Sequence, residues 1–291
     1  MASIASLLAA EGALALPGVY DALSARLAER AGFRALFLSG FGVSAARLGR
    51  PDFGFLGRAE MLDAARQVCA VVSVPVIVDV DTGWGGIFNV EAVVTELIRA
   101  GAAGCFLEDQ VFPKRCGHMR GKRVVPLDEY LPKLRAALRA RDGTAFHVTA
   151  RTDARAAVGL DEAIARARAF ADAGADAVFV EAPESVDEMA RVRAAVPAAT
   201  TLVANMVEGG RTPVRDTAAL GAAGHRLVVQ PVTGILAAAH ALQTAYAALA
   251  RDGTSAAVGD RLLGFDALNG VLGLDALYAR EAALLTDTPR G

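Results

Sequence analysis

The chain has 291 residues, of which 54% are hydrophobic and 6% aromatic, and its formal net charge is −2. This length is usual for a single α/β barrel, and the composition predicts a large aliphatic core. A nearly balanced charge without a run of Lys or Arg implies neither a nucleic acid nor a membrane partner. The three cysteines are widely spaced and form no CxxC pair, which favours a reducing compartment, so we expect a cytoplasmic protein.

Two apolar stretches have the composition of a signal peptide or a membrane span, and we interpret both as parts of the fold. Residues 1–18 are rich in Ala and Leu, but Glu11 interrupts them and no basic segment precedes them, so we expect a short helix rather than a signal peptide. Residues 227–250 lack formal charges over roughly the 20 residues that a membrane span needs. Polar residues such as Gln230 and Gln243 interrupt this stretch, which indicates a buried strand followed by a helix that faces the core.

A recurring junction follows next along the chain. Helical periodicity ends at Ala-Gly, and an apolar run then begins and ends about seven residues later. The four Ala-Gly pairs lie at 31–32, 100–101, 173–174 and 223–224. A glycine just past a helix, then a short loop and a continuous apolar strand, is typical of repeated βαβ units.

The other predicted elements complete the pattern. We expect a first strand near Val19-Tyr20 and further strands at 74–80, 146–150 and 201–204. Helices are expected at 59–70, 90–99, 128–141, 161–173 and 186–195, with Asn89, Asp128 and Asp161 as N-caps. About eight strand–helix units fit the length, which predicts an α/β fold of the (β/α)8 TIM-barrel type. We expect one barrel domain over 1–291 with a C-terminal helical extension from about 233 to 291. An open doubly wound sheet is the alternative, but no GxGxxG follows the first strand.

In such barrels the working residues lie at the C-terminal ends of the strands. Acidic side chains, an arginine and an amide would then meet at the C-terminal end of the barrel, which we call its mouth. This arrangement predicts a site for a divalent cation and an anionic substrate. The residues at these ends are Ser39, Asp79, Asp81, Glu108, Arg151, Asp153, Glu181 and Asn205.

Asp79 and Asp81 end an otherwise apolar strand, and alternation places both on one side of it. Two carboxylates this close disfavour joint ionisation unless a cation neutralises them. Glu108 ends the next strand and supplies a third carboxylate. Hard oxygen ligands with room for water and substrate suit Mg²⁺ or Mn²⁺. The alternative is that one aspartate caps the following helix and the other is solvated.

The segment Lys114-Arg115-Cys116-Gly117-His118 lies in a loop after a barrel strand. Cationic surroundings lower the pKa of a cysteine and permit proton transfer near neutral pH. Gly117 and Gly121 would let the loop move over the site. The alternative is a basic surface loop whose cysteine is incidental.

Arg151 ends an apolar strand, where a cation is costly without an anion. Its planar fork suits contact with a substrate carboxylate. The alternative is an internal ion pair with Glu181 or Asp153.

Together these segments resemble the isocitrate lyase/phosphoenolpyruvate mutase superfamily, in order and spacing, over nearly the whole chain. The residues that carry the resemblance are Tyr20–Ser24, Ser39-Gly40, Gly49–Asp52, Asp79–Gly83, Glu108–Gln110, Lys114–His118, Ala150–Ala154 and Ala204–Met206.

The resemblance implies a homotetramer whose last barrel helix is swapped between subunits. It also implies Mg²⁺ near Asp79, Asp81 and Glu108. The substrate-binding residues that it implies are Tyr20, Ser39, Gly40, Asp52, Gly117, Arg151 and Asn205. In the lyase branch the position of Cys116 is the proton donor, and Lys114, His118 and Glu181 complete the expected catalytic set.

The loop sequence Lys114–His118, called the cysteine loop below, favours a lyase. Phosphonopyruvate-type mutases and oxaloacetate decarboxylases of the superfamily generally lack it. 2-Methylisocitrate lyases carry two further arginines where this chain has Leu236 and Phe265. Their loss would leave a buried substrate carboxylate unpaired, at a cost on the order of 2 kcal/mol or more each. The best-matching branch has 2,3-dimethylmalate lyase and oxaloacetate hydrolase activities, so we expect a small dicarboxylate or 2-oxo acid substrate. Carboxyphosphonoenolpyruvate phosphonomutase chemistry, 2-methylisocitrate cleavage and a catalytically inactive binding barrel are the alternatives.

Overall fold

The computed structural model describes residues 2–117, 119–213 and 216–286. The chain forms two compact units, Met1–Ile235 and Leu236–Gly291. We predicted a single domain over residues 1–291 with a helical extension from about residue 233. The division into two units does not test that prediction, which stays a prediction.

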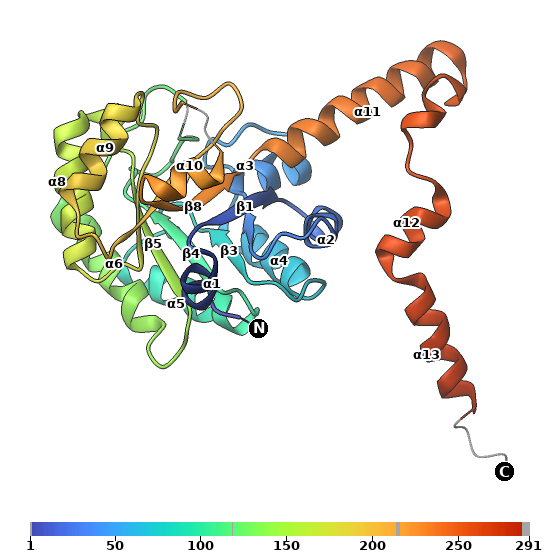
Figure 1. Cartoon of the computed structure of the whole chain (residues 1–291), viewed down its shortest axis with the longest axis horizontal. Helices are drawn as coiled ribbons and strands as arrows, with labels where there is room; N and C mark the ends of the chain where they lie inside the picture. The colour runs from blue at the N-terminus through green and yellow to red at the C-terminus, as the bar shows by residue number, and fades with distance from the viewer. Residues whose placement is uncertain (1, 118, 214–215, 287–291) are drawn as a thin grey trace. The chain divides into compact units, whose positions relative to one another are not determined.

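The first unit is a closed barrel of eight parallel strands that follow one another in chain order (Figure 1). The register Leu14↔Leu227 to Pro17↔Gln230 joins the last strand to the first and closes the barrel. The predicted TIM-type fold is therefore confirmed. The strands are β1 (Leu14–Val19), β2 (Leu36–Leu38), β3 (Val76–Asp79), β4 (Gly104–Glu108), β5 (His147–Thr152), β6 (Ala177–Val180), β7 (Thr201–Asn205) and β8 (His225–Gln230).

Helices connect these strands and cover the outside of the barrel. Their apolar residues recur at helical spacing, as in α5, where Val90, Val93, Val94 and Leu97 are all buried. These helices are α2 (Ala22–Arg30), α3 (Gly40–Val43), α4 (Arg58–Cys69), α5 (Ile87–Arg99), α6 (Leu127–Ala140), α7 (Ala154–Ala157), α8 (Leu160–Asp172), α9 (Val186–Ala195) and α10 (Thr217–Ala222). Helix α1 (Ile4–Glu11) precedes β1, and α11 (Thr233–Asp252) follows β8. A π-helical segment, η1 (Ser44–Leu48), follows α3 directly.

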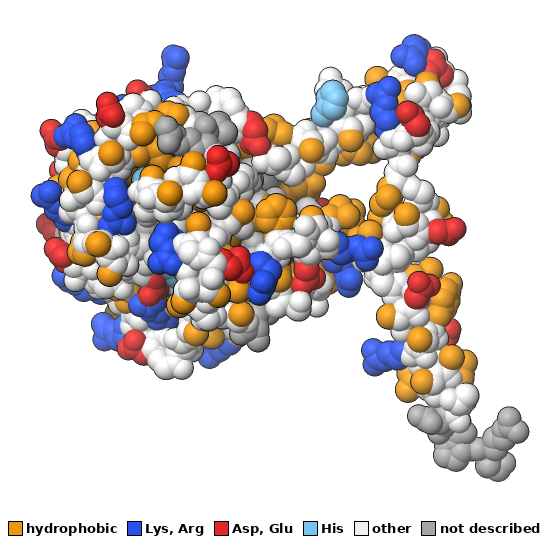
Figure 2. Space-filling view, viewed as in Figure 1, with side chains coloured by type: hydrophobic (Ala, Val, Ile, Leu, Met, Phe, Trp, Pro, Cys, Tyr) orange, Lys and Arg blue, Asp and Glu red, His pale blue; other side chains and the backbone are white. Residues whose placement is uncertain are grey.

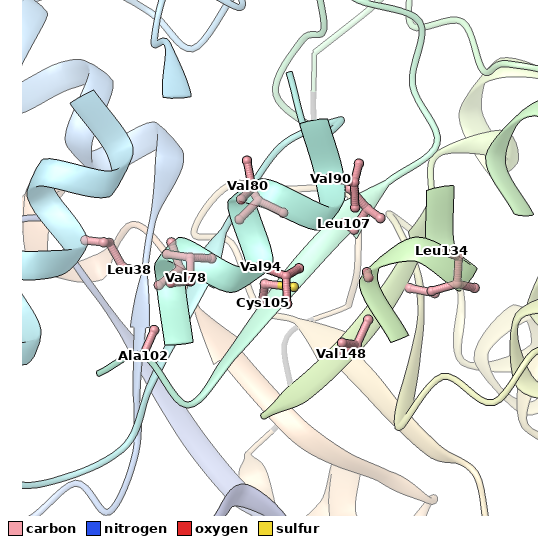
Figure 3. Close-up of a cluster of buried hydrophobic side chains, with 14 of the residues drawn as sticks. Leu38, Val78, Val80, Val90, Val94, Ala102, Cys105, Leu107, Leu134 and Val148 are labelled. Atoms are coloured by element: carbon pink, nitrogen blue, oxygen red, sulfur yellow. The ribbon is translucent and has the colours of Figure 1, made fainter. Parts of the chain in front are cut away.

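Aliphatic side chains fill the layer between strands and helices. Figure 3 shows Val78 and Val80 of the β3 segment, with Leu107 and Val148 of β4 and β5, packed towards Val94 of α5. Strands buried on both faces explain why the sequence reads as continuous apolar runs rather than as an alternating pattern.

A second cluster fills the barrel interior. The ring centroids of Phe37 and Phe106 are 4.9 Å apart, and those of Phe106 and Phe179 are 5.8 Å apart. Ile4 and Leu8 of α1 belong to the same buried cluster. The centre of the barrel is thus packed with side chains, and α1 contributes to that packing.

Some predicted boundaries were wrong. The first strand begins at Leu14, before the predicted Val19-Tyr20, because Leu14 to Pro17 pair with β8. Asn89 is not an N-cap: it lies in the first turn of α5, and its side chain accepts a hydrogen bond from Gly86 N. Asp128 and Asp161 also lie inside the first turns of their helices, where carboxylates stabilise the positive helix end.

The second unit comprises most of α11, a 3₁₀ segment (η2, Ala256–Arg261), α12 (Phe265–Leu272) and α13 (Leu274–Thr286). Within the described chain only Ala248 of α11 is buried, so the prediction that this helix faces a core is wrong for the chain alone. Hydrophobic side chains are exposed along these helices (Figure 2), for example Phe265 at 80%. Helix swapping and the tetramer stay predictions.

No single helix of the described residues has both the length and the apolar composition of a membrane span. The bent pair Ala256–Leu272 and Leu274–Thr286 meets that test by length and composition only.

Candidate active site

The predicted strand-end residues lie at one end of the barrel, because parallel strands place their C-terminal ends together. Glu108 of β4 is the direct register partner of Arg151 of β5. Asp79 ends β3, Asn205 ends β7, and Glu181 immediately follows β6. All except Asn205 are buried.

Asp79 and Asp81 share a common space, although strand alternation is not the reason. The strand ends at Asp79, and Asp81 has a left-handed φ of +48°. This turn is held by a hydrogen bond of 3.1 Å from Asp81 N to Asp79 Oδ1. Gly40 packs against both carboxylates, since a Cβ there would lie 3.0 Å from Asp79 Oδ2 and 3.6 Å from Asp81 Oδ1.

Lys114 provides the first internal cation of the site. Its Nζ lies 2.6 Å from Asp52 Oδ1 and 2.7 Å from Asp81 Oδ1. Burial alone would lower the pKa of the Lys114 ammonium, but Asp81 and Asp52 outweigh burial and raise it well above its ordinary value. Burial raises the pKa of Asp81 to about 7, and Asp79 and Asp52 add to this while Lys114 opposes it. Lys114 therefore stays charged but does not fully compensate the carboxylates around it.

Three buried carboxylate oxygens lack a hydrogen-bond partner among the described residues: Asp81 Oδ1, Asp81 Oδ2 and Glu108 Oε1. Asp81 Oδ1 is in the ion pair with Lys114, which leaves Asp81 Oδ2 and Glu108 Oε1 for a ligand. The two residues are neighbours, because Glu108 N donates to Asp81 O over 2.9 Å. Burial raises the pKa of Glu108 well above its ordinary value, with Asp153 and Asp81 adding to the effect while Arg151 and Lys114 oppose it. Buried carboxylate oxygens without a hydrogen-bond partner, at the C-terminal ends of neighbouring strands, are surroundings that suit a hard divalent cation.

The charge balance of the mouth supports the same fit. Among the described residues, buried carboxylates outnumber buried Lys and Arg side chains by two: they are Asp52, Asp79, Asp81, Glu108, Asp109, Asp153 and Glu181 against Lys114, Lys122, Lys133, Arg151 and Arg166. Within the same part of the chain no three Asp, Glu, His or Cys side chains form a ready-made metal cluster. Mg²⁺ does not need one, because it commonly binds one or two carboxylates and keeps several waters.

Arg151 lies at the centre of the acidic side chains. Its Nε is 3.0 Å from Asp153 Oδ2, its Nη2 is 3.2 Å from Glu181 Oε2, and its Nη1 is 3.4 Å from Glu108 Oε2. Both internal ion pairs that the sequence left as alternatives are therefore present. Burial would lower the pKa of Arg151, but Asp153, Glu108 and Glu181 raise it well above its usual value.

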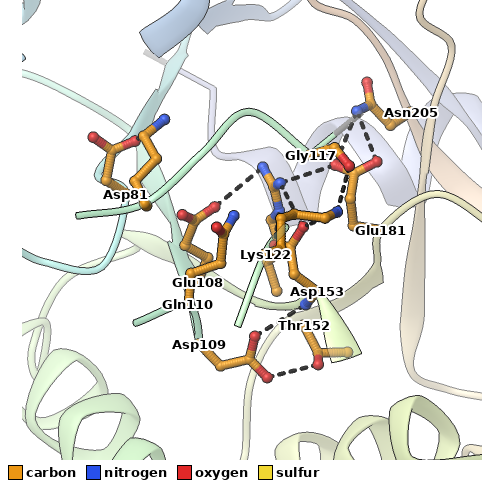
Figure 4. Close-up of polar contacts among 12 residues, drawn as sticks. Asp81, Glu108, Asp109, Gln110, Gly117, Lys122, Thr152, Asp153, Glu181 and Asn205 are labelled. Atoms are coloured by element: carbon orange, nitrogen blue, oxygen red, sulfur yellow. Dashed lines mark hydrogen bonds and ion pairs between the residues drawn. The ribbon is translucent and has the colours of Figure 1, made fainter. Parts of the chain in front are cut away.

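Glu181 is fully buried beside Arg151. Asn205 Nδ2 donates to both of its oxygens, over 3.3 and 3.1 Å (Figure 4). Gly117, from the cysteine loop, lies against the same group: a Cβ at this position would come within 2.5 Å of Arg151 Nη2 and of Glu181 Oε2. Only a glycine lets the loop backbone approach these two side chains so closely.

The cysteine loop is attached to the barrel mouth at several points. Cys116 N donates to Asp52 O over 3.1 Å. The Gln110 side chain binds both backbone groups of Arg115, over 2.8 and 3.0 Å. Cys116 itself is partly buried and not in a disulfide. His118, which the sequence assigned to the catalytic set, lies outside the described residues.

Ser39 and Tyr20 border the mouth on the β1–β2 side. Ser39 is buried at the end of β2, and its side chain caps α3 by accepting from Gly42 N over 3.2 Å. Tyr20 follows β1 directly and packs against Gly42, where a Cβ would lie 2.9 Å from Tyr20 Cβ. Both predicted substrate-binding residues thus lie beside α3, which begins at Gly40.

Sequence reasoning missed the polar residues beneath the site. Asp109 accepts from Thr152 Oγ1 at 2.6 Å, from Asp153 N at 2.9 Å and from Arg166 Nη1 at 2.9 Å. Arg166 is 4% exposed on the inner face of α8, between Ala163 and Phe170. An arginine on the apolar face of an amphipathic helix was the signal that could have revealed this network.

A family model described as phosphoenolpyruvate phosphomutase matches residues 4–250. The chain belongs to the phosphoenolpyruvate mutase/isocitrate lyase superfamily and is an enzyme of it, so the predicted superfamily is confirmed. It is 45% identical to petal death protein of Dianthus caryophyllus over 280 residues, 96% of this chain and 87% of that protein. It is 41% identical to 2,3-dimethylmalate lyase of Eubacterium barkeri over 280 residues, 96% of each chain.

Solved structures of the same superfamily are also similar to this chain. Oxaloacetate acetylhydrolase with the inhibitor 3,3-difluorooxalacetate is 37% identical, with a TM-score of 0.89, over 95% of this chain and 94% of that one. Phosphonopyruvate hydrolase with oxalate and Mg²⁺ is 31% identical, with a TM-score of 0.84, over 95% and 96% of the two chains. The chain is thus similar to enzymes that break bonds in small oxo acids and hydroxy acids.

Proposed function

We propose that this chain is a Mg²⁺- or Mn²⁺-dependent lyase that breaks a carbon–carbon bond in a small 2-hydroxy or 2-oxo dicarboxylate. The substrate class is a 2-alkylmalate of the 2,3-dimethylmalate kind, or oxaloacetate. The observation that carries the proposal is the position of the cysteine loop, whose Gly117 lies directly against Arg151 and Glu181. That contact brings the backbone next to the Cys116 thiol to the same mouth as Asp81 and Glu108, each of which has a carboxylate oxygen without a hydrogen-bond partner among the described residues.

Asp79, Asp81 and Glu108 would hold the cation. The excess of buried negative charge supports this assignment, because an anionic substrate could not enter such a mouth without a compensating cation. When bound, the cation would polarise the oxo acid end of the substrate and stabilise the negative charge that develops during cleavage. Lys114 would hold Asp52 and Asp81 in place beside it.

The oxo acid end of the substrate would lie on Ser39, Gly40 and Arg151. Gly40 offers a backbone N–H at the start of α3 next to Asp79 and Asp81. Arg151 offers Nη1, whose contact with Glu108 is the longest of its three ion pairs. Tyr20, Asp52, Gly117 and Asn205 would border the rest of the substrate.

In the cleavage step Glu181 would accept the proton of the 2-hydroxyl group of a 2-alkylmalate; for oxaloacetate, one water first adds to C2, the proton comes from a hydroxyl of the resulting hydrate, and C2 becomes a carboxyl carbon of oxalate. The C2–C3 bond then breaks, C2 becomes the carbonyl carbon of the 2-oxo acid product, and the electron pair stays with C3 as an enolate of the departing carboxylate. Cys116 would donate its proton to C3 and release the saturated acid. His118 belongs to this set by resemblance alone.

The number of carboxylates that the chain can pair supports the dicarboxylate assignment. Two arginines that 2-methylisocitrate lyases are expected to use for a third carboxylate are replaced here by Leu236 and Phe265. A tricarboxylate would therefore keep one charge without a partner, which disfavours it against a dicarboxylate.

The test is an NMR analysis of products after incubation with Mg²⁺ and 2,3-dimethylmalate, oxaloacetate or 2-methylisocitrate. We expect pyruvate plus propionate from 2,3-dimethylmalate, or oxalate plus acetate from oxaloacetate. Succinate from 2-methylisocitrate would overturn the argument from Leu236 and Phe265. No turnover of any of the three would overturn the proposed substrate class and direct the search to phosphonates, the chemistry of the alternative phosphonomutase function.

A further inference from the structure

Lysine is rare in this chain and is always buried. Three of the 30 basic residues are lysines, and all others are arginines. Lys114 is 3% exposed in the site, Lys133 is 9% exposed on α6, and Lys122 is 7% exposed between β4 and α6. Lys114 has a place in the proposed mechanism, whereas the buried cation of Lys122 has none so far.

Lys122 connects the cysteine loop to the end of β5. Its Nζ donates to Gly117 O and, over 2.6 Å, to Asp153 Oδ1 (Figure 4). Gly117 directly follows Cys116, and Asp153 directly follows β5. One ammonium group therefore joins the backbone of the thiol-bearing loop to a residue of the barrel mouth.

Asp153 is a rigid point of attachment. Its carboxylate also accepts hydrogen bonds from Arg151, over 3.0 Å from Nε and 3.2 Å from Nη2, and its backbone N donates to Asp109. Asp109 is in turn held by Thr152 and Arg166. Asp153 is fully buried, so Lys122 and Arg151 share an anion that cannot turn towards solvent.

The same geometry determines where the loop backbone lies. The carbonyl of Gly117 is held by Lys122, while the α-carbon of Gly117 faces Arg151 Nη2 and the Glu181 carboxylate. If Gly117 O moved away from Lys122, the α-carbon of Gly117 would also move away from Arg151 and Glu181. Gly117 has no side chain that could keep it in contact with these two residues. The position of Cys116 then depends on an ammonium six residues further along the chain.

We propose that Lys122 is a positioning residue: it holds Gly117 against Arg151 and Glu181 and thereby sets the place of the Cys116 thiol. This inference rests on the proposed function of Cys116. A lysine suits the task because a compact ammonium can donate to a carbonyl and a carboxylate at once, whereas the planar guanidinium of arginine prefers paired acceptors in one plane.

The experiment compares wild type with Lys122→Met, and uses Lys133→Met as the matched loss of a buried lysine outside the site. Hydrogen–deuterium exchange of the ligand-free proteins is measured for peptides that contain Cys116 N, which is bonded to Asp52 O. We expect exchange at least 10-fold faster in Lys122→Met and unchanged in Lys133→Met. With the active substrate we expect kcat to fall at least 30-fold in Lys122→Met while KM changes less than 5-fold.

A second variant, Lys122→Gln, retains a donor for Gly117 O and packs a similar stem, so it is used if Lys122→Met fails to fold. It should fall between wild type and Lys122→Met in both readouts. Wild-type exchange and wild-type kcat in the folded Lys122 variants would overturn the positioning role. Faster exchange in a protein that turns over none of the proposed substrates would overturn the proposed function but support the positioning of the loop.

Discussion

Arg151 and Glu108 face each other across the ladder between β5 and β4, and Arg151 Nη1 lies 3.4 Å from Glu108 Oε2. Glu108 is 2% exposed, and its second oxygen has no partner among the described residues. This pair therefore combines a shielded cation with a carboxylate that can still accept a ligand, which is the arrangement the proposed substrate and cation need.

Arg151→Met should destabilise the fold strongly. The change leaves Asp153, Glu181 and Glu108 without their shared cation, and removing one partner of a buried ion pair costs about 3–5 kcal/mol. Urea unfolding followed by circular dichroism measures the loss. Arg191→Met, which removes an exposed pair with Asp161, is the control and should change the free energy of unfolding by less than about 1 kcal/mol. Similar losses in the two variants would contradict the role of the central arginine.

Cys116→Ala should slow turnover strongly but leave ligand binding intact. A general acid contributes about 10²- to 10⁴-fold to a rate, so kcat should fall by that factor with the active substrate. Calorimetric titration with oxalate and Mg²⁺ should give a Kd within a few-fold of wild type. Cys69→Ala is the control: burial raises the pKa of the Cys69 thiol to about 11, and its loss should leave kcat unchanged. A Cys116→Ala protein with wild-type kcat would remove the proposed proton donor.

The free energy of unfolding should decrease at acid pH because of Asp153. Burial opposes ionisation of Asp153, but Arg151 and Lys122 outweigh it and lower the pKa to about 2 from the ordinary aspartate value of 3.8. A lowered folded-state pKa adds stability above the unfolded pKa and loses it as the pH falls through the folded pKa, here between about 4 and about 2. This contribution is about 2 kcal/mol. The difference in free energy of unfolding between wild type and Asp153→Asn should therefore shrink from pH 5 to pH 2.5 in urea titrations. A difference that stays constant over that range would refute the assignment.

A divalent cation should stabilise the protein through Asp81 and Glu108. Bound ligand at 100 times its Kd adds about 2.7 kcal/mol to the free energy of unfolding, so Tm should rise with Mg²⁺ until it saturates, and EDTA should reverse the rise. Asp81→Asn should abolish the Mg²⁺-dependent change. Asp172→Asn, which alters an exposed carboxylate at the end of α8, should retain it. An equal Mg²⁺ response in all three proteins would show that the cation binds elsewhere.

Much of this site could be predicted from the sequence because a parallel barrel converts strand ends into neighbours. Apolar runs that end in Ser39, Asp79, Glu108, Arg151 and Asn205 were sufficient to place those residues at one mouth. The Ala-Gly junctions worked for the same reason, since Gly32, Gly101, Gly174 and Gly224 all have positive φ after a helix.

The remaining parts depend on contacts that no local pattern encodes. Lys122 reaches Asp153 across 31 positions, and Arg166 reaches Asp109 across 57, through loop and helix geometry that exists only after folding. Asp81 was placed beside Asp79 for a wrong reason, since a left-handed turn and not strand alternation brings it there. Helix starts were displaced because carboxylates are favourable in the first turn as well as at the N-cap.

The phenyl rings of Phe37, Phe106 and Phe179 pack in the barrel interior beneath the site. Among the described residues, the proposed substrate would therefore reach the site from the C-terminal end of the barrel. Arg151 Cζ lies 5.2 Å above the Phe179 ring, so the proposed binding residues rest directly on this aromatic layer, with α1 packed into the same cluster. Substrate and both products then share one entrance. In the proposed reaction the fragment nearer to that entrance would depart first, and the 2-oxo acid or oxalate held against Arg151 would depart last. The last product to leave binds the same free enzyme as the substrate, so it should inhibit competitively, and the first should not.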